Sequence, residues 1–234
     1  MPATLMINEI FYSVQGESTW AGWPCVFVRL TGCHLRCHYC DTEYAFTQGR
    51  RMGIDQILTE AQRQTGAAPC PLWEITGGEP LLQQDVHRLM THLCDAGKTV
   101  LLETSGACDI STCDSRVIRI LDLKTPGSGE VERNLLSNLE HLAPTDEIKF
   151  VITGETDFLW AKDMVLRHEL DAKAHAVLFS PVTAIPASNQ IAGCADLLSS
   201  QLAHWLQTDA ELAGRVRLQS QMHKQIWPGG PRGV

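Results

Sequence analysis

The chain has 234 residues, of which 44% are hydrophobic and 20% charged, so it can build one domain with a large core and is unlike a disordered chain. Its formal net charge is −8, with 27 acidic and 19 basic side chains. Binding along a nucleic acid needs a basic face, so this composition argues against nucleic-acid binding and favours a small-molecule substrate.

The segment MPATLMINEI lacks a basic stretch followed by a long apolar run, and no apolar run reaches the roughly 18 residues that cross a membrane. We therefore expect a cytoplasmic protein that makes no contact with a membrane. Nine cysteines, an odd number without a regular framework, indicate reduced thiols in a reducing compartment.

Apolar runs of strand length alternate with helical patterns along the chain. The runs are mostly continuous, which is typical of parallel strands covered on both faces. Apolar spacing of three and four residues predicts helices over 54–61, 82–93 and 198–206. The expected strands are 25–31, 72–76, 98–104, 117–123, 147–153 and 174–180.

This alternation predicts an α/β fold with right-handed crossovers and a parallel sheet. A full eight-unit barrel needs about 250 residues, so the chain favours an incomplete (βα)6-type TIM-like barrel, formed as a single domain over 1–234. Polar motifs follow the strands, namely TGCHLRCHYCDT, TGGEP, ETSG, DLKTPGS and FSP. Because ligands bind at the carboxyl ends of such strands, we expect the motifs to converge on one site.

Three cysteines, Cys33, Cys37 and Cys40, lie close together after the first of these strands. Thiolates are soft ligands that select zinc, copper(I) or iron–sulfur clusters. A structural zinc site could be completed by His34 or His38, which would make the chain a zinc-stabilised interaction module. A [4Fe-4S] cluster held by three thiolates would instead leave one iron open. The spacing favours the cluster and leaves zinc as an alternative.

The neighbouring residues carry a resemblance. The Cys-x3-Cys-x2-Cys spacing with Tyr39 before the last cysteine resembles the signature of the radical S-adenosylmethionine (SAM) superfamily, and GGEP and ETSG resemble two further SAM contacts of that superfamily. The stretch NEIFYSVQGESTWAGWPCVFVRLTGCHLRCHYCDTEYAF, with TGGEP, DLKTPGS and RLQSQMHKQIW, closely resembles the family of 7-carboxy-7-deazaguanine synthases over nearly the whole chain.

The resemblance implies a carbon–nitrogen lyase of queuosine and other 7-deazapurine biosynthesis, which converts 6-carboxy-5,6,7,8-tetrahydropterin to 7-carboxy-7-deazaguanine with loss of ammonia. It implies a [4Fe-4S] cluster on the three cysteines, SAM and Mg²⁺ as cofactors, and an electron donor such as a flavodoxin or ferredoxin. It further implies a homodimer, and a radical SAM core with a short N-terminal substrate-binding segment and a C-terminal extension.

Individual residues follow from the same resemblance, and their chemistry suits these roles. Arg29 offers a planar fork for the substrate carboxylate, and the bare backbone of TGGEP leaves room for the SAM ammonium. Magnesium is expected at Thr42. The substrate-binding residues implied are Val14, Gln15, Gly16, Glu17, Arg29 and Thr76. The SAM-binding residues implied are Tyr39, Asp41, Gly78, Glu79, Glu103, Ser105, Asp122, Leu123, Lys124, Ser180 and Pro181.

A second enzyme class shares the cysteine spacing. Activating enzymes that place a glycyl radical on a partner protein also carry Cys-x3-Cys-x2-Cys and have a similar size. The VQGES motif and Arg29 suit a small carboxylated heterocycle better than a protein loop. The synthase is therefore the favoured interpretation.

Overall fold

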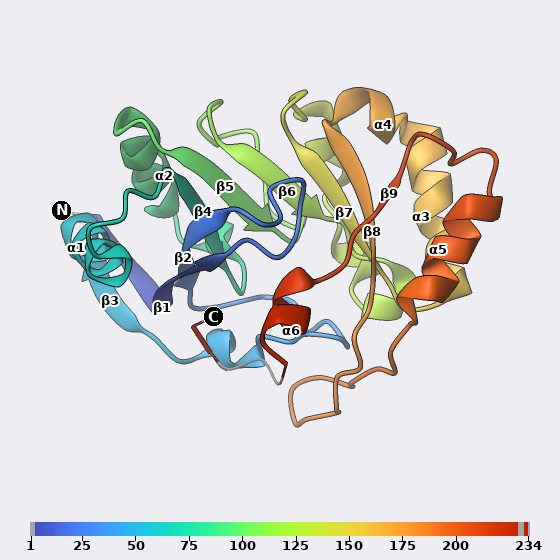
Figure 1. Cartoon of the computed structure of the whole chain (residues 1–234), viewed down its shortest axis with the longest axis horizontal. Helices are drawn as coiled ribbons and strands as arrows, with labels where there is room; N and C mark the ends of the chain where they lie inside the picture. Colours follow the sequence, from blue (N-terminus) through green and yellow to red (C-terminus); the bar gives the residue numbers. More distant parts are fainter. Residues whose placement is uncertain (1–2, 229–231, 234) are drawn as a thin grey trace.

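One sheet organises the chain. The computed structural model describes residues 3–228 and 232–233, and within them nine strands form a single sheet in the order β3-β1-β2-β4-β5-β6-β7-β8-β9 (Figure 1). Neighbours from β2 onward are parallel, whereas β1 is antiparallel to both β2 and β3. The strands are β1 (Thr4–Val14), β2 (Pro24–Leu30), β3 (Arg50–Gly53), β4 (Leu72–Gly77), β5 (Thr99–Thr104), β6 (Ile118–Asp122), β7 (Glu147–Ile152), β8 (Ala176–Pro181) and β9 (Arg217–Leu218).

The six expected parallel strands are found as β2 and β4 to β8, and the partial α/β barrel is confirmed. Their continuous apolar character has the expected cause, because every residue of β8 and all but the last of β4 are buried. The structure adds β1, β3 and β9. The sequence did not reveal β1, because its buried and half-buried residues follow no regular alternation.

Helices cover the outer face of the sheet. Figure 1 shows α1 and α2 at one end and α3 to α5 at the other, with α6 near the middle of the sheet and apart from them. No helix within residues 3–228 and 232–233 has the length and apolar character needed to span a membrane. The α-helices are α1 (Ile54–Thr65), α2 (Val86–Asp95), α3 (Glu155–His168), α4 (Leu170–Lys173), α5 (Ser199–Thr208) and α6 (Met222–Ile226). The 3₁₀ helices are η1 (Glu43–Phe46), η2 (Pro80–Leu82), η3 (Pro126–Ser128), η4 (Val131–Arg133) and η5 (Leu136–Glu140).

The three predicted helices are present as α1, α2 and α5, with one difference. Leu82 was expected on the buried face of the second helix, but it ends η2 and is exposed. Pro80 begins that separate turn, and the α-helix begins only at Val86. Helix α3, which packs against β7, was not predicted.

The inner face of the curved sheet changes from apolar to polar along the strands. Alternate residues of a strand share one face, so Phe27 and Arg29 of β2 both face the interior, where they line one cavity. The rings of Phe27 and Phe11 are stacked with centroids 4.8 Å apart. The apolar floor of the interior consists of Phe11, Cys25, Phe27, Leu72, Leu101 and Ile120.

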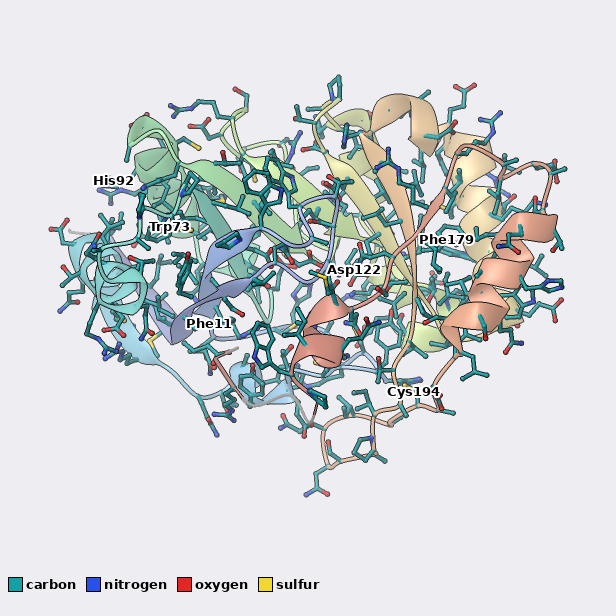
Figure 2. All side chains as sticks on the ribbon, in the orientation of Figure 1. Phe11, Trp73, His92, Asp122, Phe179 and Cys194 are labelled. Atoms are coloured by element: carbon teal, nitrogen blue, oxygen red, sulfur yellow. The ribbon has the colours of Figure 1, made fainter. Side chains whose placement is uncertain are left out.

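Two larger cores fill the space between the sheet and the helices. Figure 2 places Asp122 near the centre of the sheet, between Trp73 on the side of α2 and Phe179 on the side of α3. Trp73 belongs to the core beneath α1 and α2, and Phe179 to the core beneath α3 and α5. The helices therefore cover the outside and leave the interior of the curve to other segments.

The loop between β1 and β2 (residues 15–23, the hairpin loop) closes part of this interior. Its ends are joined by a hydrogen bond from Gln15 N to Trp23 O of 2.8 Å. Thr19 N donates to Glu147 Oε2 of β7 at 3.0 Å, and Ser18 N donates to Gln219 Oε1, just after β9, at 2.8 Å. These hydrogen bonds hold the loop over the concave side of the sheet, where it reaches from β1 to β7.

A buried ion pair joins β6 to the start of β7. Arg119 Nη2 lies 2.5 Å from Asp146 Oδ2, and the two side chains are 9% and 0% exposed. Asp146 also accepts hydrogen bonds from the backbone nitrogens of Arg119 and Ala143 at 2.9 and 2.7 Å. Arg119 Nη2 also donates to His141 O at 2.9 Å, and Nη1 donates to Ile110 O at 3.4 Å. The pair thus fixes the segment that leads into β7.

Replacing Asp146 by alanine is expected to lower the free energy of unfolding by about 3–5 kcal/mol, because the buried Arg119 guanidinium loses its counter-charge. Urea denaturation followed by circular dichroism measures this loss. The exposed pair of Arg63 and Glu60 provides the control, since Arg63→Ala should change the unfolding free energy little. Equal effects of the two substitutions would contradict the prediction.

Candidate functional site

A cavity of about 250 Å³ lies inside the curve of the sheet, toward the carboxyl ends of the parallel strands. It is formed by the strand ends, the hairpin loop, the loop that carries the three cysteines (residues 31–42, the cysteine loop) and α6. The convergence expected from the parallel strands is therefore what the structure shows. The predicted site residues that line the cavity are Val14, Gln15, Gly16, Glu17, Arg29, Cys33, Cys37, Tyr39, Cys40, Asp41, Thr42, Thr76, Gly78, Glu103, Ser105, Asp122, Lys124, Ser180 and Pro181.

The three cysteines give the cavity a soft-ligand face. Burial raises the pKa of each of the thiols of Cys33, Cys37 and Cys40, so they must lose protons when they bind a metal. In the part of the chain that the structure describes, no three His, Cys, Asp or Glu side chains are arranged to hold a single metal ion. Three thiols around one cavity suit a multi-iron cluster. His34 and His38 do not line the cavity.

The end of β4 packs directly on the end of β2 and on the start of the cysteine loop. Gly78 N donates to Leu30 O at 3.3 Å, and Glu79 N donates to Gly32 O at 2.8 Å. A Cβ added to Gly77 would lie 2.5 Å from Leu30 O, and one added to Gly78 would lie 2.3 Å from Gly32 O. The bare backbone expected for ligand access is thus also required by packing, since no side chain fits between these two segments.

Two predicted SAM residues do not line the cavity. Glu79 is fully buried, and its carboxylate accepts hydrogen bonds from Leu81 N at 3.0 Å, Thr104 Oγ1 at 2.9 Å and Ser105 N at 2.8 Å. It therefore ties the end of β4 to the end of β5 and positions Ser105, which does line the cavity. Leu123 is fully buried in the core beneath α3 and α5.

Lys149 of β7 lies at the centre of a buried charge network. Its side chain is 7% exposed, and its Nζ lies 3.0 Å from Glu17 Oε2 and 3.6 Å from Asp122 Oδ2 and also contacts Glu103 Oε1. Asp122 lies a further 2.9 Å from Lys124 Nζ. Although burial opposes it, the Lys149 ammonium holds the pKa of Glu17 at about 2. Glu17 is therefore ionised at neutral pH.

Two other carboxyl groups in the cavity have the opposite tendency. Burial, together with the carboxylates of Glu103 and Glu17, raises the pKa of Glu74 to about 8. Burial raises the pKa of Glu103 to about 7 despite the nearby Lys149. Glu74 therefore retains its proton near neutral pH, whereas Glu103 is about half protonated there.

Arg29 presents a fork to the cavity. Its Nε donates to Glu9 Oε1 at 2.7 Å, and the Tyr44 hydroxyl donates to the same oxygen at 2.8 Å. The guanidinium carbon lies 5.8 Å from the centroid of the Phe11 ring. Among the described residues, no hydrogen bond uses its two terminal nitrogens. They can therefore grip a ligand carboxylate through two charge-assisted hydrogen bonds.

The C-terminal helix α6 supplies lining residues that the sequence did not reveal. Met222 N donates to Gly16 O at 2.9 Å, and Lys224 Nζ lies 2.9 Å from Asp41 Oδ2 of the cysteine loop. Gln221 Nε2 donates to Glu17 Oε1 at 2.9 Å. These contacts join segments that are remote in sequence, so no local pattern indicates them. The unpredicted polar lining residues include Glu74, Lys149, Gln221, His223 and Lys224.

Lys149 and Glu74 did leave a signal in the sequence. Glu74 is the one charged residue of LWEIT, and Lys149 lies inside EIKFVIT, whose other charged residue, Glu147, stands at its start. A charge in a strand covered on both faces must find a partner or a ligand. Both residues could therefore have been placed at the interior.

Comparisons with known proteins agree with this geometry. Residues 27–123 match the model of the radical SAM superfamily. The 7-carboxy-7-deazaguanine synthase of Koribacter versatilis is 43% identical over 98% of this chain and 100% of the relative. That of Chlorobaculum tepidum is 42% identical over 99% of this chain and 98% of the relative. The crystal structure of QueE from Escherichia coli is similar in fold, with a TM-score of 0.71 and 24% identity over 94% of this chain and 95% of that one.

Replacing Gly16 by alanine is expected to displace α6, because the added Cβ would lie 2.4 Å from Nδ1 and 2.8 Å from N of His223. Hydrogen exchange measured by mass spectrometry should become faster in residues 221–226. Gly154→Ala is the matched control, since nothing lies within 4 Å of a Cβ added there. Unchanged exchange in Gly16→Ala would show that α6 does not rest on this contact.

The raised pKa of Glu74 predicts a pH dependence of stability. Between its ordinary pKa of 4.5 and about 8, the native protein keeps a proton on Glu74 that the unfolded chain has lost. Its contribution to the free energy of unfolding therefore decreases as pH rises through this range.

Glu74→Gln removes that contribution. The unfolding free energy of the variant minus that of the wild-type protein should thus increase between about pH 5.5 and pH 8.5, by a few kcal/mol in order of magnitude. Urea denaturation of both metal-free proteins at several pH values measures the difference. Glu140→Gln, at an exposed position, should show no such trend.

Proposed function

Because the chain belongs to the family of 7-carboxy-7-deazaguanine synthases, we propose that it converts 6-carboxy-5,6,7,8-tetrahydropterin to 7-carboxy-7-deazaguanine with loss of ammonia, in the biosynthesis of queuosine and other 7-deazapurines. The observation that carries the proposal is that three thiols, the Arg29 fork and the hairpin loop meet in one cavity. A soft-metal face and a carboxylate-binding face thus lie within reach of one small molecule.

The residues fit the cofactors of a radical SAM enzyme. Cys33, Cys37 and Cys40 would hold three irons of a [4Fe-4S] cluster and leave the fourth for SAM. When bound, the cluster and SAM supply a 5'-deoxyadenosyl radical that removes a hydrogen atom from the substrate. The strand ends would bind SAM through Gly78, Ser105, Asp122, Lys124, Ser180 and Pro181.

Glu103 is proposed to accept the ribose hydroxyls of SAM. It lines the cavity at the end of β5, and its contact with Lys149 fixes the side chain. Tyr39 and Asp41 flank the last cysteine and line the same side. The indirect position of Glu79 suggests a different task for it, since it holds Ser105 in place rather than facing a ligand.

The substrate is proposed to lie deeper, against the hairpin loop. Arg29 would hold its carboxylate, and Thr76 and the segment from Val14 to Glu17 would contact the pterin. Glu17 is held by Lys149 and by Gln221, the residue just before α6. Contacts within the protein therefore position Glu17 on the substrate side of the cavity.

Magnesium is proposed at Thr42. The Thr42 hydroxyl lines the cavity 3.9 Å from the sulfur of Cys40. Hydroxyl oxygen is a hard ligand, and magnesium completes its shell with water and substrate oxygens. Thr42 would hold such an ion at the cysteine loop, where it would supply a positive charge to the substrate-binding cavity.

We further propose an electron donor, an oligomeric state, a cellular location and a domain organisation for the enzyme. Reductive cleavage of SAM consumes an electron, so a donor such as a flavodoxin or ferredoxin is required. The resemblance supports a homodimer, and the reduced cysteines support a cytoplasmic location. We also propose one radical SAM domain over 1–234, with an N-terminal substrate-binding segment and a C-terminal extension, of which residues 1–2, 229–231 and 234 lie outside the described part.

Family membership argues against both alternatives that the cysteine spacing left open. A relative that is 43% identical over 98% of this chain carries the synthase name, rather than that of a glycyl-radical activating enzyme. The interpretation as a zinc-stabilised module is likewise disfavoured, because the chain matches the radical SAM superfamily over residues 27–123.

The decisive experiment is a product assay. Anaerobically reconstituted protein, incubated with 6-carboxy-5,6,7,8-tetrahydropterin, SAM, Mg²⁺ and a reductant, should form 7-carboxy-7-deazaguanine, detected by mass spectrometry. Cys37→Ala should lose both product and the visible iron absorbance while its circular dichroism is retained. Cys194→Ala, whose thiol does not line the cavity, should keep all three. An intact cluster without product would refute the proposed reaction.

A further inference from the structure

Glu74 differs from the other acidic side chains around the cavity. It lies on β4, is 6% exposed and lines the cavity, yet it has no ion pair among the described residues. Its acidic neighbours are paired with cations. The pairs are Glu17 and Glu103 with Lys149, Asp122 with Lys124 and Lys149, and Asp41 with Lys224.

The hydrogen bonds of Glu74 leave one oxygen unused. Gln15 Nε2 donates to Glu74 Oε2. Gln15 Oε1 accepts from Glu17 N at 2.9 Å, so the amide of Gln15 is held by protein groups at both ends. Oε1 of Glu74 has no hydrogen-bond partner in the described residues, and it is not among the atoms sealed off from solvent. It therefore faces the cavity.

Charges from several elements surround Glu74 without pairing with it. Arg29 of β2 and Lys149 of β7 are attractive neighbours, while Glu103 of β5 and Glu17 of the hairpin loop are repulsive ones. Neither cation lies within ion-pair distance of Glu74 among the described residues. A buried carboxyl group without an ion pair is stabilised either by a proton of its own or by hydrogen-bond donors from a ligand.

The proposed substrate offers such donors. A pterin carries a ring N3–H and a 2-amino group side by side, and two adjacent N–H groups match the two oxygens of a carboxylate. Phe27 is the register partner of Glu74 on β2 and stacks on Phe11, so a flat apolar wall adjoins the carboxyl group. A planar ring can lie against that wall with its donor edge toward Glu74.

We propose, building on the proposed function, that Glu74 is a specificity-determining residue that accepts the N3–H and 2-amino hydrogens of the pterin. Oε1 takes one donor, and Oε2, which Gln15 fixes in place, takes the other. The raised pKa of Glu74 fits an acceptor that is protonated until the ligand replaces the proton with its own donors.

The test compares two ligands that differ at one group. Pterin-6-carboxylic acid carries the 2-amino group, whereas lumazine-6-carboxylic acid has an oxygen there; neither has a hydrogen on C6 to abstract. Calorimetric binding to the reconstituted protein with SAM and Mg²⁺ at pH 7 should show about 10- to 100-fold tighter binding of the pterin. Glu74→Gln should reduce this preference to less than about threefold, because an amide offers both a donor and an acceptor.

Glu140→Gln is the matched control and should keep the wild-type preference, since it changes an exposed glutamate in the same way. Equal binding of the two acids by the wild-type protein, or an undiminished preference in Glu74→Gln, would overturn the role of Glu74. The wild-type comparison needs no variant, so equal binding of the two acids overturns the role of Glu74 even if Glu74→Gln does not fold.

The product assay on the same preparation separates this inference from the proposed function. Product formation without a preference for the pterin overturns the role of Glu74 alone. Absence of both product and pterin binding, with an intact cluster, overturns the proposed function and the inference with it. Product formation with a preference that Glu74→Gln abolishes supports both.

Discussion

The buried ammonium of Lys149 is the constraint on which the arrangement of the cavity depends. A charge that is 7% exposed must be neutralised, and the carboxylates that neutralise it come from three different segments. Glu103 and Asp122 come from β5 and β6, and Glu17 comes from the hairpin loop, 132 residues away in sequence. The loop is thus held over the sheet by charge. Its position in turn sets where α6 docks, because Met222 bonds Gly16 of that loop.

The two ends of the cavity are fixed by different physical means. At the cysteine end, backbone packs on backbone, and Gly77 and Gly78 leave no side chain between β4 and the cysteine loop. At the deep end, ion pairs and amide hydrogen bonds hold the side chains. This division suits a site in which a bulky metal cluster needs space, whereas a small polar heterocycle needs directed hydrogen bonds. Glu79, which follows β4, ties the end of that strand to the end of β5, because its carboxylate accepts hydrogen bonds from Thr104 and Ser105.

The sequence predicted those parts of the structure that depend on local patterns. Apolar runs located six parallel strands, and the parallel arrangement placed their polar ends at one site. The error at Leu82 arose because helical spacing continued across Pro80, which begins a separate turn. Lys149 and Glu74 were visible as charges within apolar strands but were not interpreted. The contribution of α6 could not be predicted, because it depends on a contact between Gly16 and His223 that no local pattern encodes.

Burial and an excess of acidic side chains explain why protons remain on the acids of the cavity. Five carboxyl groups and four cationic side chains line it, so one negative charge is in excess if all are ionised. The carboxyl groups are Glu17, Asp41, Glu74, Glu103 and Asp122, and the cations are Arg29, Lys124, Lys149 and Lys224. With a pKa of about 8, Glu74 holds a proton that offsets this excess near neutral pH, and Glu103, with a pKa of about 7, is about half protonated there. SAM brings a sulfonium and an ammonium, and a pterin brings N–H donors. Ligands of this chemistry can replace the protons, so the acidity of the cavity selects for them before any reaction begins.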